Sequence, residues 1–364
     1  MKQNTFPPEL TTDLFRELLD AEYASPSMLV YAAKREHRRL PTLLLSVFES
    51  EGEPLGSGAR DELRRARERA RDYRELHEAI SEVAECRALK GAYLAGLYPK
   101  GLRRPVGDLD LVFADEPSLW RGVRRALDLR EVTQIGFALH GEEGREIGIE
   151  LHWSSEDDLL DGTASAEFHT AALPGDSATV PVRSALPENA WAAGLLGLAE
   201  ERFQRPFGIR DAIDVYMMAA CAPAADEVVE ALRGCCREPE IVELLTYTGG
   251  LLDIGPLKPL SGALSAPADE ETERRARESR RPGVPSDEED VVRRFSAGLP
   301  VQGFMLRRRD DRPDWSGVRR HEFSHGWIAM SPIGDFLLCG GEVVARDAYE
   351  AALEELELIE GDAE

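Results

Sequence analysis

The sequence predicts an α+β protein, with a mixed-sheet core between an N-terminal helical region and a helical C-terminal domain. From Leu63 to Ala84, apolar residues recur at three- and four-residue steps, which is typical of one long amphipathic helix. Near residue 88 the pattern changes to short runs with alternating apolar positions, and helical spacing returns after Pro187. The chain has 364 residues, of which 43% are hydrophobic, so it can bury the cores of two domains.

The expected elements follow in chain order. Short helices over residues 8–50 and the long charged helix assign residues 1–79 to an N-terminal helical region. The mixed-sheet core is predicted over residues 80–185, with strands at Gly107–Phe113, Val132–Leu139 and Arg145–Trp153 and a helix at Ser118–Leu129. Residues 186–265 are expected to form a helical domain, with helices at Asn189–Phe203, Ile209–Cys221 and Asp226–Cys236. Residues 266–290 are charged and contain proline, which predicts an exposed linker or loop, and residues 291–364 form a β-rich tail with a final helix.

The charge balance limits the classes of partner. Acidic residues number 68 against 44 basic ones, which gives a formal net charge of -24. Such a surface repels nucleic-acid backbones and anionic lipids, so bulk nucleic-acid binding is disfavoured, although a local cationic pocket can still hold one triphosphate. The sequence shows neither an apolar run of membrane-spanning length nor an apolar N-terminal signal segment, and we expect a cytoplasmic protein.

The most informative segment contains Asp108 and Asp110, two positions apart in an otherwise apolar run. On a strand, side chains alternate between faces, so both aspartates project to one side while Leu109 and Leu111 enter the core. Carboxylates this close repel each other unless they share a cation or one is protonated. Mg²⁺ accepts carboxylate oxygens and completes its shell with water and substrate phosphates. The pattern therefore predicts a magnesium site, with a solvated strand edge as the alternative for the pair taken alone.

A second expected strand supplies Glu150 and His152. In Glu146 to Trp153 the apolar residues share one face, which leaves Glu150 and His152 on the other. If this strand lies next to the Asp108 strand, three carboxylates surround one pocket and can hold two metal ions across an in-line displacement. His152 is a candidate contact to nucleotide or metal, and a hydrogen-bonded structural histidine is the alternative.

These residues resemble a known family. Four segments carry the resemblance: Lys90-Gly91, Arg103, Asp108-Leu109-Asp110-Leu111 and Glu150-Leu151-His152-Trp153. Over roughly residues 80 to 220 they are similar to the uncharacterised bacterial nucleotidyltransferase family of the DNA polymerase beta-like superfamily. The resemblance implies that Asp108 and Asp110 contact both metals and that Glu150 orients or deprotonates the acceptor hydroxyl. It also implies phosphate binding at a Gly-Ser pair, where this chain has Gly91-Ala92.

The basic residues near this motif are the natural partners of a triphosphate. Cations beside a transferring phosphoryl group stabilise its developing charge, which makes Lys90, Arg103 and Arg104 candidate nucleotide contacts together with Gly91 and His152. For Arg103 and Arg104, simple surface solvation is the alternative.

We therefore expect a Mg²⁺-dependent nucleotidyltransferase that uses two metal ions. It would move a nucleoside monophosphate, with AMP from ATP as the default, to a hydroxyl group and release pyrophosphate. The acceptor is a small molecule, a peptide or a protein, and the acidic net charge places an RNA end last. The alternative is a catalytically inactive scaffold that keeps the fold and binds a protein or peptide partner.

Overall fold

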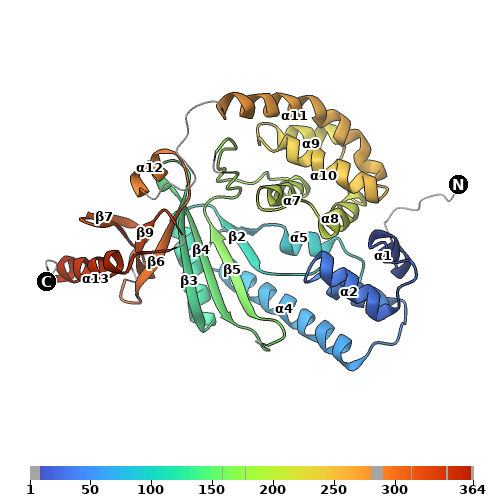
Figure 1. The fold of residues 1–364 in the computed structure, drawn as a ribbon, viewed down its shortest axis with the longest axis horizontal. Helices are drawn as coiled ribbons and strands as arrows, with labels where there is room; N and C mark the ends of the chain where they lie inside the picture. Colours follow the sequence, from blue (N-terminus) through green and yellow to red (C-terminus); the bar gives the residue numbers. More distant parts are fainter. Residues whose placement is uncertain are drawn as a thin grey trace. The chain divides into compact units, whose positions relative to one another are not determined.

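The computed structural model describes residues 9–157, 159–176, 178–279, 290–312, 314–341 and 343–361. Within these residues the chain forms thirteen α-helices and nine strands, and all nine strands belong to one mixed sheet (Figure 1). The chain divides into two compact units that alternate along the sequence. The first unit comprises Met1–Glu75, Ala88–Leu109 and Leu186–Ala276, and the second comprises Leu76–Arg87, Asp110–Ala185 and Arg277–Glu364. The expected domains, by contrast, were continuous blocks of sequence.

The first unit is helical. It contains α1 (Thr12–Leu18), α2 (Pro26–Glu36), α3 (Leu40–Ser50), α5 (Gly91–Gly96), α7 (Ala190–Glu200), α8 (Ile209–Ala219), α9 (Ala225–Leu232), α10 (Glu238–Leu251), most of α4 (Ser57–Ser81) and most of α11 (Lys258–Glu278), with short 3-10 turns at Glu201–Phe203 and Gly255–Leu257. Side-chain caps start several of these helices: Ser25 accepts from the N–H of Met28, and Asn189 accepts from that of Ala192. Buried apolar residues of α3 and α8, among them Leu44 and Ile213, share one core.

Helix α11 corrects the expected loop at residues 266–290. The helix continues to Glu278 through Pro267, and residues 280–289 lie outside the described part of the chain. Its charged second half is held by ion pairs: Arg275 contacts Glu240 of α10 at 2.6 Å and Glu271 of its own helix at 2.8 Å. The absence of apolar periodicity misled the prediction because partly buried ion pairs, rather than an apolar stripe, fix this segment.

The second unit contains most of the sheet, whose strand order is β1-β2-β5-β4-β3-β6-β9-β8-β7. The strands are β1 (Cys86–Ala88), β2 (Leu109–Phe113), β3 (Val132–His140), β4 (Glu146–Ser154), β5 (Thr163–His169), β6 (Val301–Arg308), β7 (Arg319–Phe323), β8 (Gly326–Met330) and β9 (Gly334–Cys339). The helices of this unit are α6 (Glu116–Leu129), α12 (Val291–Ser296) and α13 (Arg346–Gly361), with a 3-10 turn at Glu142–Gly144. The predicted strands at β2, β3 and β4 and the predicted helix at α6 are confirmed.

The C-terminal strands are not a separate tail, because they extend the same sheet. Strand β6 pairs with β3, with Gly303 opposite Phe137, and β6 in turn pairs with β9. Gly303 is required here, since a Cβ at this position would lie 2.6 Å from the ring of Phe137. Helix α13 packs on this part of the sheet through Ala352 and Leu356.

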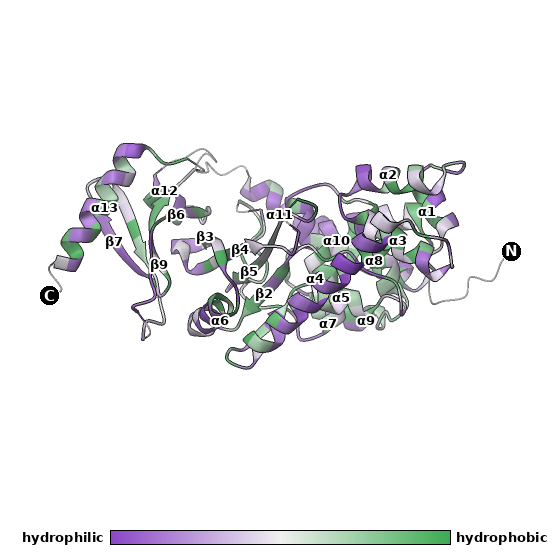
Figure 2. Ribbon diagram, turned by 90° about the horizontal axis from the view of Figure 1, so that it is seen from below, coloured by the Kyte–Doolittle hydropathy of each residue, from purple (hydrophilic) through white to green (hydrophobic). Residues whose placement is uncertain are grey.

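Helix α6 covers the apolar face of β2 and β5. Phe113 of β2 and Phe168 of β5 stack with ring centroids 5.8 Å apart, and Gly122 of α6 approaches Phe113 so closely that a Cβ would lie 2.5 Å from its ring. Hydrophilic and hydrophobic residues alternate along α4, as its sequence predicts (Figure 2). No helix in the described residues has the length and apolarity to cross a membrane. The opposite face of β2, β5 and β4 carries the polar residues considered next.

Candidate functional site

Three carboxylates meet where β2 lies beside β5. Asp108 directly precedes β2, Asp110 lies within it, and Glu167 lies on β5. One carboxylate oxygen from each lies within 4.8 Å of the other two, and in the described residues this is the group that could hold a metal ion. Asp108 is exposed, whereas Asp110 and Glu167 are half-buried. Three carboxylates at this spacing repel one another in the absence of a cation, and together they offer the oxygen ligands that Mg²⁺ prefers.

The strand pairing expected for Glu150 is wrong. Strand β5 lies between β2 and β4, so Glu150 is one strand removed from the aspartates and faces Glu167 directly across the β4–β5 ladder. The carboxylate next to Asp110 is therefore Glu167, which the sequence interpretation missed. Residues 163–169 do carry a signal, because Ala164, Ala166 and Phe168 alternate with polar residues as in a half-buried strand. The role of Glu150 itself stays a prediction.

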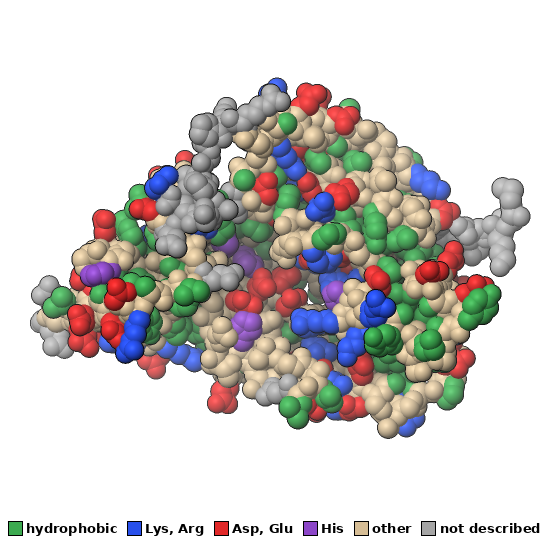
Figure 3. All heavy atoms as spheres, in the orientation of Figure 1, with side chains coloured by type: hydrophobic (Ala, Val, Ile, Leu, Met, Phe, Trp, Pro, Cys, Tyr) green, Lys and Arg blue, Asp and Glu red, His purple; other side chains and the backbone are tan. Residues whose placement is uncertain are grey.

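Strands β4 and β5 present the same Glu-x-His pattern side by side. Glu150 Oε1 lies 3.0 Å from His152 Nε2, and Glu167 Oε2 lies 3.1 Å from His169 Nε2. Each carboxylate therefore has an imidazole on its own strand two residues later, on the same face of the sheet. Acidic and histidine side chains gather over these strands in the space-filling view (Figure 3). His152 thus has a structural partner in Glu150, and its predicted contact with a nucleotide is untested.

Gly148 of β4 lets two imidazole rings approach the backbone closely on this face. A Cβ at Gly148 would lie 3.2 Å from Nε2 of His140 on β3 and 3.3 Å from Nδ1 of His169 on β5. Burial, together with the neighbouring His169, lowers the pKa of His140 to about 4, so this imidazole is neutral at pH 7. A side chain at this position of β4 would crowd both rings, so the glycine allows them to pack here.

Lys90 and Gly91 lie at the start of α5 in the first unit. Lys90 has φ 60° and ψ -68°, an uncommon backbone conformation for a residue with a Cβ. Its Nζ lies 2.5 Å from Oε1 of Glu201, whose pKa is held down by Lys90 and Arg205 against the effect of burial. A Cβ added to Gly91 would meet nothing within 4 Å, so packing does not require glycine there. Phosphate binding by these two residues stays a prediction.

The two arginines of the motif have different environments. Arg103 is exposed, and its backbone N–H donates to Ser46 Oγ at 2.9 Å. Arg104 is buried and donates from Nε and Nη2 to the two oxygens of Asp214 at 2.7 and 2.8 Å, while the hydroxyl of Tyr98 donates to the same carboxylate. The expected triphosphate contact of Arg104 is therefore corrected: a buried bidentate ion pair already holds its guanidinium.

Arg39 is a cation near Asp108 that the sequence did not single out. Its Nη1 donates to the carbonyl of Val106 at 2.6 Å, and a Cβ on Gly107 would lie 2.8 Å from the same nitrogen. Burial and the nearby Arg69 and Arg38 lower the pKa of Arg39, and the charge of Asp108 partly offsets this. The guanidinium therefore supports the backbone that leads into the aspartate motif.

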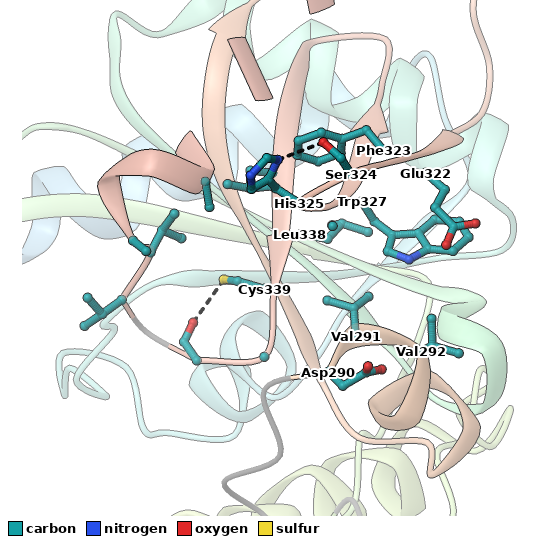
Figure 4. A pocket seen from close by; sticks show the side chains of 18 residues that line it. Asp290, Val291, Val292, Glu322, Phe323, Ser324, His325, Trp327, Leu338 and Cys339 are labelled. Carbon is teal, nitrogen blue, oxygen red and sulfur yellow. Dashed lines mark hydrogen bonds between the residues drawn. The ribbon is translucent and has the colours of Figure 1, made fainter. Parts of the chain in front are cut away.

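The second unit also contains a cavity of about 450 Å³, whose lining does not include Asp108, Asp110 or Glu167 (Figure 4). Trp327, Leu338 and Cys339 are among its lining residues, and Ser324 Oγ lies 2.8 Å from His325 Nδ1 at its edge. Both of these polar residues are exposed, and no carboxylate orients His325 among the contacts of the described residues. The cavity thus lacks the third group of a nucleophilic triad.

Comparison with known proteins gave no family model, no curated protein and no solved structure that matches this chain. The resemblance drawn from the motifs therefore stays a prediction.

Proposed function

We propose that this protein is a Mg²⁺-dependent nucleotidyltransferase that moves a nucleoside monophosphate from an NTP, with ATP as the default, to a hydroxyl of a small molecule, peptide or protein. The observation that carries the proposal is the cluster of Asp108, Asp110 and Glu167 at the junction of β2 and β5. The motif resemblance implies an Asp-x-Asp pair and a third acid at the metals. It named Glu150 as that acid, whereas the acid beside the pair in this structure is Glu167. We accordingly propose a nucleotidyltransferase-type core within the mixed sheet.

Each carboxylate has a proposed task in this reaction. Asp108, Asp110 and Glu167 would hold Mg²⁺, which supplies charge neutralisation on the phosphates and on the attacking oxygen. Glu167 accepts the proton of the acceptor hydroxyl, whose oxygen forms a bond to the α-phosphorus. The bond from that phosphorus to the oxygen bridging to the β-phosphate breaks, and pyrophosphate leaves with the electron pair. Glu150 and its partner His152 lie beside Glu167 and would orient the acceptor.

The test measures which phosphate of ATP becomes covalently attached to an acceptor. The full chain is incubated with Mg²⁺ and ATP labelled at either the α- or the γ-phosphate, together with a bacterial metabolite extract, a peptide mixture or no acceptor. The proposal expects covalent label from α-labelled ATP and none from γ-labelled ATP, and it expects the label to be lost in Asp110→Asn. Asp128→Asn is the matched control, since Asp128 is an exposed residue of α6, the helix that covers the opposite face of the sheet.

Two results would overturn the proposal. Transfer of the γ-label would indicate a kinase, and equal labelling by the wild type and Asp110→Asn would remove the cluster from the mechanism. Calorimetric titration with ATP distinguishes the enzyme from the inactive scaffold. After the heat of the protein-free titration is subtracted, a scaffold without a metal site gives the same binding heat in Mg²⁺ and in EDTA.

A further inference from the structure

A corner of the first unit contains more hydrogen-bond donors than it has acceptors for. It lies where the end of α2 meets the start of α8, and it contains His37, Arg39 and Arg210, with Lys90 and Arg205 nearby. Arg210 lies in the first turn of α8, within the helix expected at Ile209–Cys221. The contacts of each cation show which of them are already neutralised.

Two of the cations have carboxylate partners. Lys90 pairs with Glu201 at 2.5 Å, and Arg205 pairs with both Glu201 at 3.2 Å and Asp211 at 2.7 Å. Asp211 also accepts from the backbone N–H of Gly208 at 2.9 Å, which caps the start of α8. The acceptor oxygens of both acids are therefore engaged by these neighbours.

Arg210 differs from the other two. Its Nε is buried and has no hydrogen-bond partner among the described residues, although a buried guanidinium N–H left unpaired is costly. Its Nη1 lies 3.2 Å from Nε2 of His37, and in the described part of the chain no carboxylate lies within ion-pair distance of it. Glu201 contributes a longer-range attraction, since the charge of Arg210 helps to lower the pKa of that carboxyl.

His37 cannot accept from both of its neighbours. The backbone N–H of Arg39 points to Nδ1 at 3.2 Å, and Nη1 of Arg210 faces Nε2 at the same distance. Burial, with Arg210 and Arg205 close by, lowers the pKa of His37 to about 4, so its ring is neutral at pH 7. A neutral imidazole has one acceptor nitrogen and one N–H. Whichever nitrogen carries the proton, one N–H of the ring faces another donor.

We propose that Arg210 and His37 form a binding site for a phosphate group. A phosphate group placed at this corner would accept from the unpaired Nε–H of Arg210 through one oxygen and from the Nε2–H of His37 through another, which would leave Nδ1 of His37 to accept from Arg39. The orphan N–H thereby gains a partner and the two facing donors no longer conflict. Inorganic phosphate and the phosphates of a nucleotide share this chemistry, and the nucleotide case rests on the proposed function.

The site is tested by calorimetric titration of the full chain with sodium phosphate, sodium tripolyphosphate and ATP, all in EDTA. Arg210→Gln should weaken tripolyphosphate binding at least about tenfold, because it removes the positive charge and the charge-assisted hydrogen bond from Nε. Arg35→Gln is the matched control: it removes the same charge from an exposed position in the last turn of α2, and the affinity should change by less than about twofold, as expected for a screened surface charge.

Two further variants keep the result interpretable. Arg210→Lys retains the charge without the planar donors and should bind with intermediate affinity, and thermal melts of all variants show whether they fold. Asp110→Asn should bind tripolyphosphate like the wild type in EDTA, so this experiment can succeed even if the metal-dependent reaction fails. Tighter binding of ATP than of phosphate identifies the nucleotide as the source, and the reverse identifies free phosphate. Equal tripolyphosphate affinity in wild type and folded Arg210→Gln, or no binding by the wild type, overturns the proposal.

Discussion

Replacing Asp110 by Asn should raise the stability of the metal-free protein and abolish its response to metal. Asp110 shares the β2–β5 junction with Asp108 and Glu167, with one oxygen of each within 4.8 Å of the others. Asn keeps the size of the side chain but not its charge. In the metal-free protein the substitution therefore removes two of the three pairwise repulsions among these acids.

The magnitude follows from Coulomb's law. Two unit charges 4.8 Å apart repel by about 1 kcal/mol at the dielectric constant of water and by about 3.5 kcal/mol at an effective dielectric constant near 20. Asp108 is exposed and the other two acids are half-buried, so values near the water limit apply. Loss of two repulsions then raises the free energy of unfolding by about 1–2 kcal/mol at low salt, and less when ions screen the charges.

The assay is a thermal melt of wild type, Asp110→Asn and the control Asp128→Asn, first in EDTA at low ionic strength and then with MgCl₂ or MnCl₂. In EDTA the melting temperature of Asp110→Asn should exceed that of the wild type by about 1–3 °C. Added metal should raise the melting temperatures of the wild type and the control, and it should leave the melting temperature of Asp110→Asn unchanged. A variant that melts well below the wild type in EDTA would refute the reasoning and make Asp110 a structural residue. Equal stabilisation of all three proteins by metal would remove it from the metal site.

Three further predictions test other parts of the structure. Glu167→Gln should abolish the metal-dependent rise in melting temperature, whereas Glu150→Gln should retain most of it. The opposite result would indicate that Glu150 is the third metal ligand. Arg104→Met should lower the free energy of unfolding, measured in urea, by about 3–5 kcal/mol because it leaves the buried carboxylate of Asp214 unpaired, and a loss below 1 kcal/mol would contradict a buried ion pair. His140 has its folded-state pKa lowered from 6.5 to about 4, so its contribution to stability is complete above pH 6.5 and falls as the pH drops from 6.5 to about 4, by about 3 kcal/mol in total. Melts from pH 7 to 4 should show a smaller decline in His140→Asn than in wild type, and parallel curves would contradict a neutral buried ring.

The local part of the site could be predicted from the sequence. The Asp-x-Asp pair with alternating apolar neighbours predicted β2 and the common face of Asp108 and Asp110, and the spacing in residues 145–153 predicted β4 with Glu150 and His152 on its polar side. Side-chain alternation is a property of each strand alone, with a period of two residues, so it needs no knowledge of the neighbouring strands.

Strand order, and with it the third carboxylate, was decided by the tertiary structure. Strand β5 lies between β4 and β2, and its Phe168 stacks on Phe113 of β2 beneath α6. No local pattern in the sequence contains that long-range contact. The same holds for Arg104, whose partner Asp214 lies 110 residues away in the sequence, and for His37 and Arg210, which are 173 residues apart. Sequence spacing fixed which face each acid occupies, whereas long-range packing fixed which charges meet, because the free energy of a buried ion pair or an orphaned donor depends on groups that only the folded chain brings together.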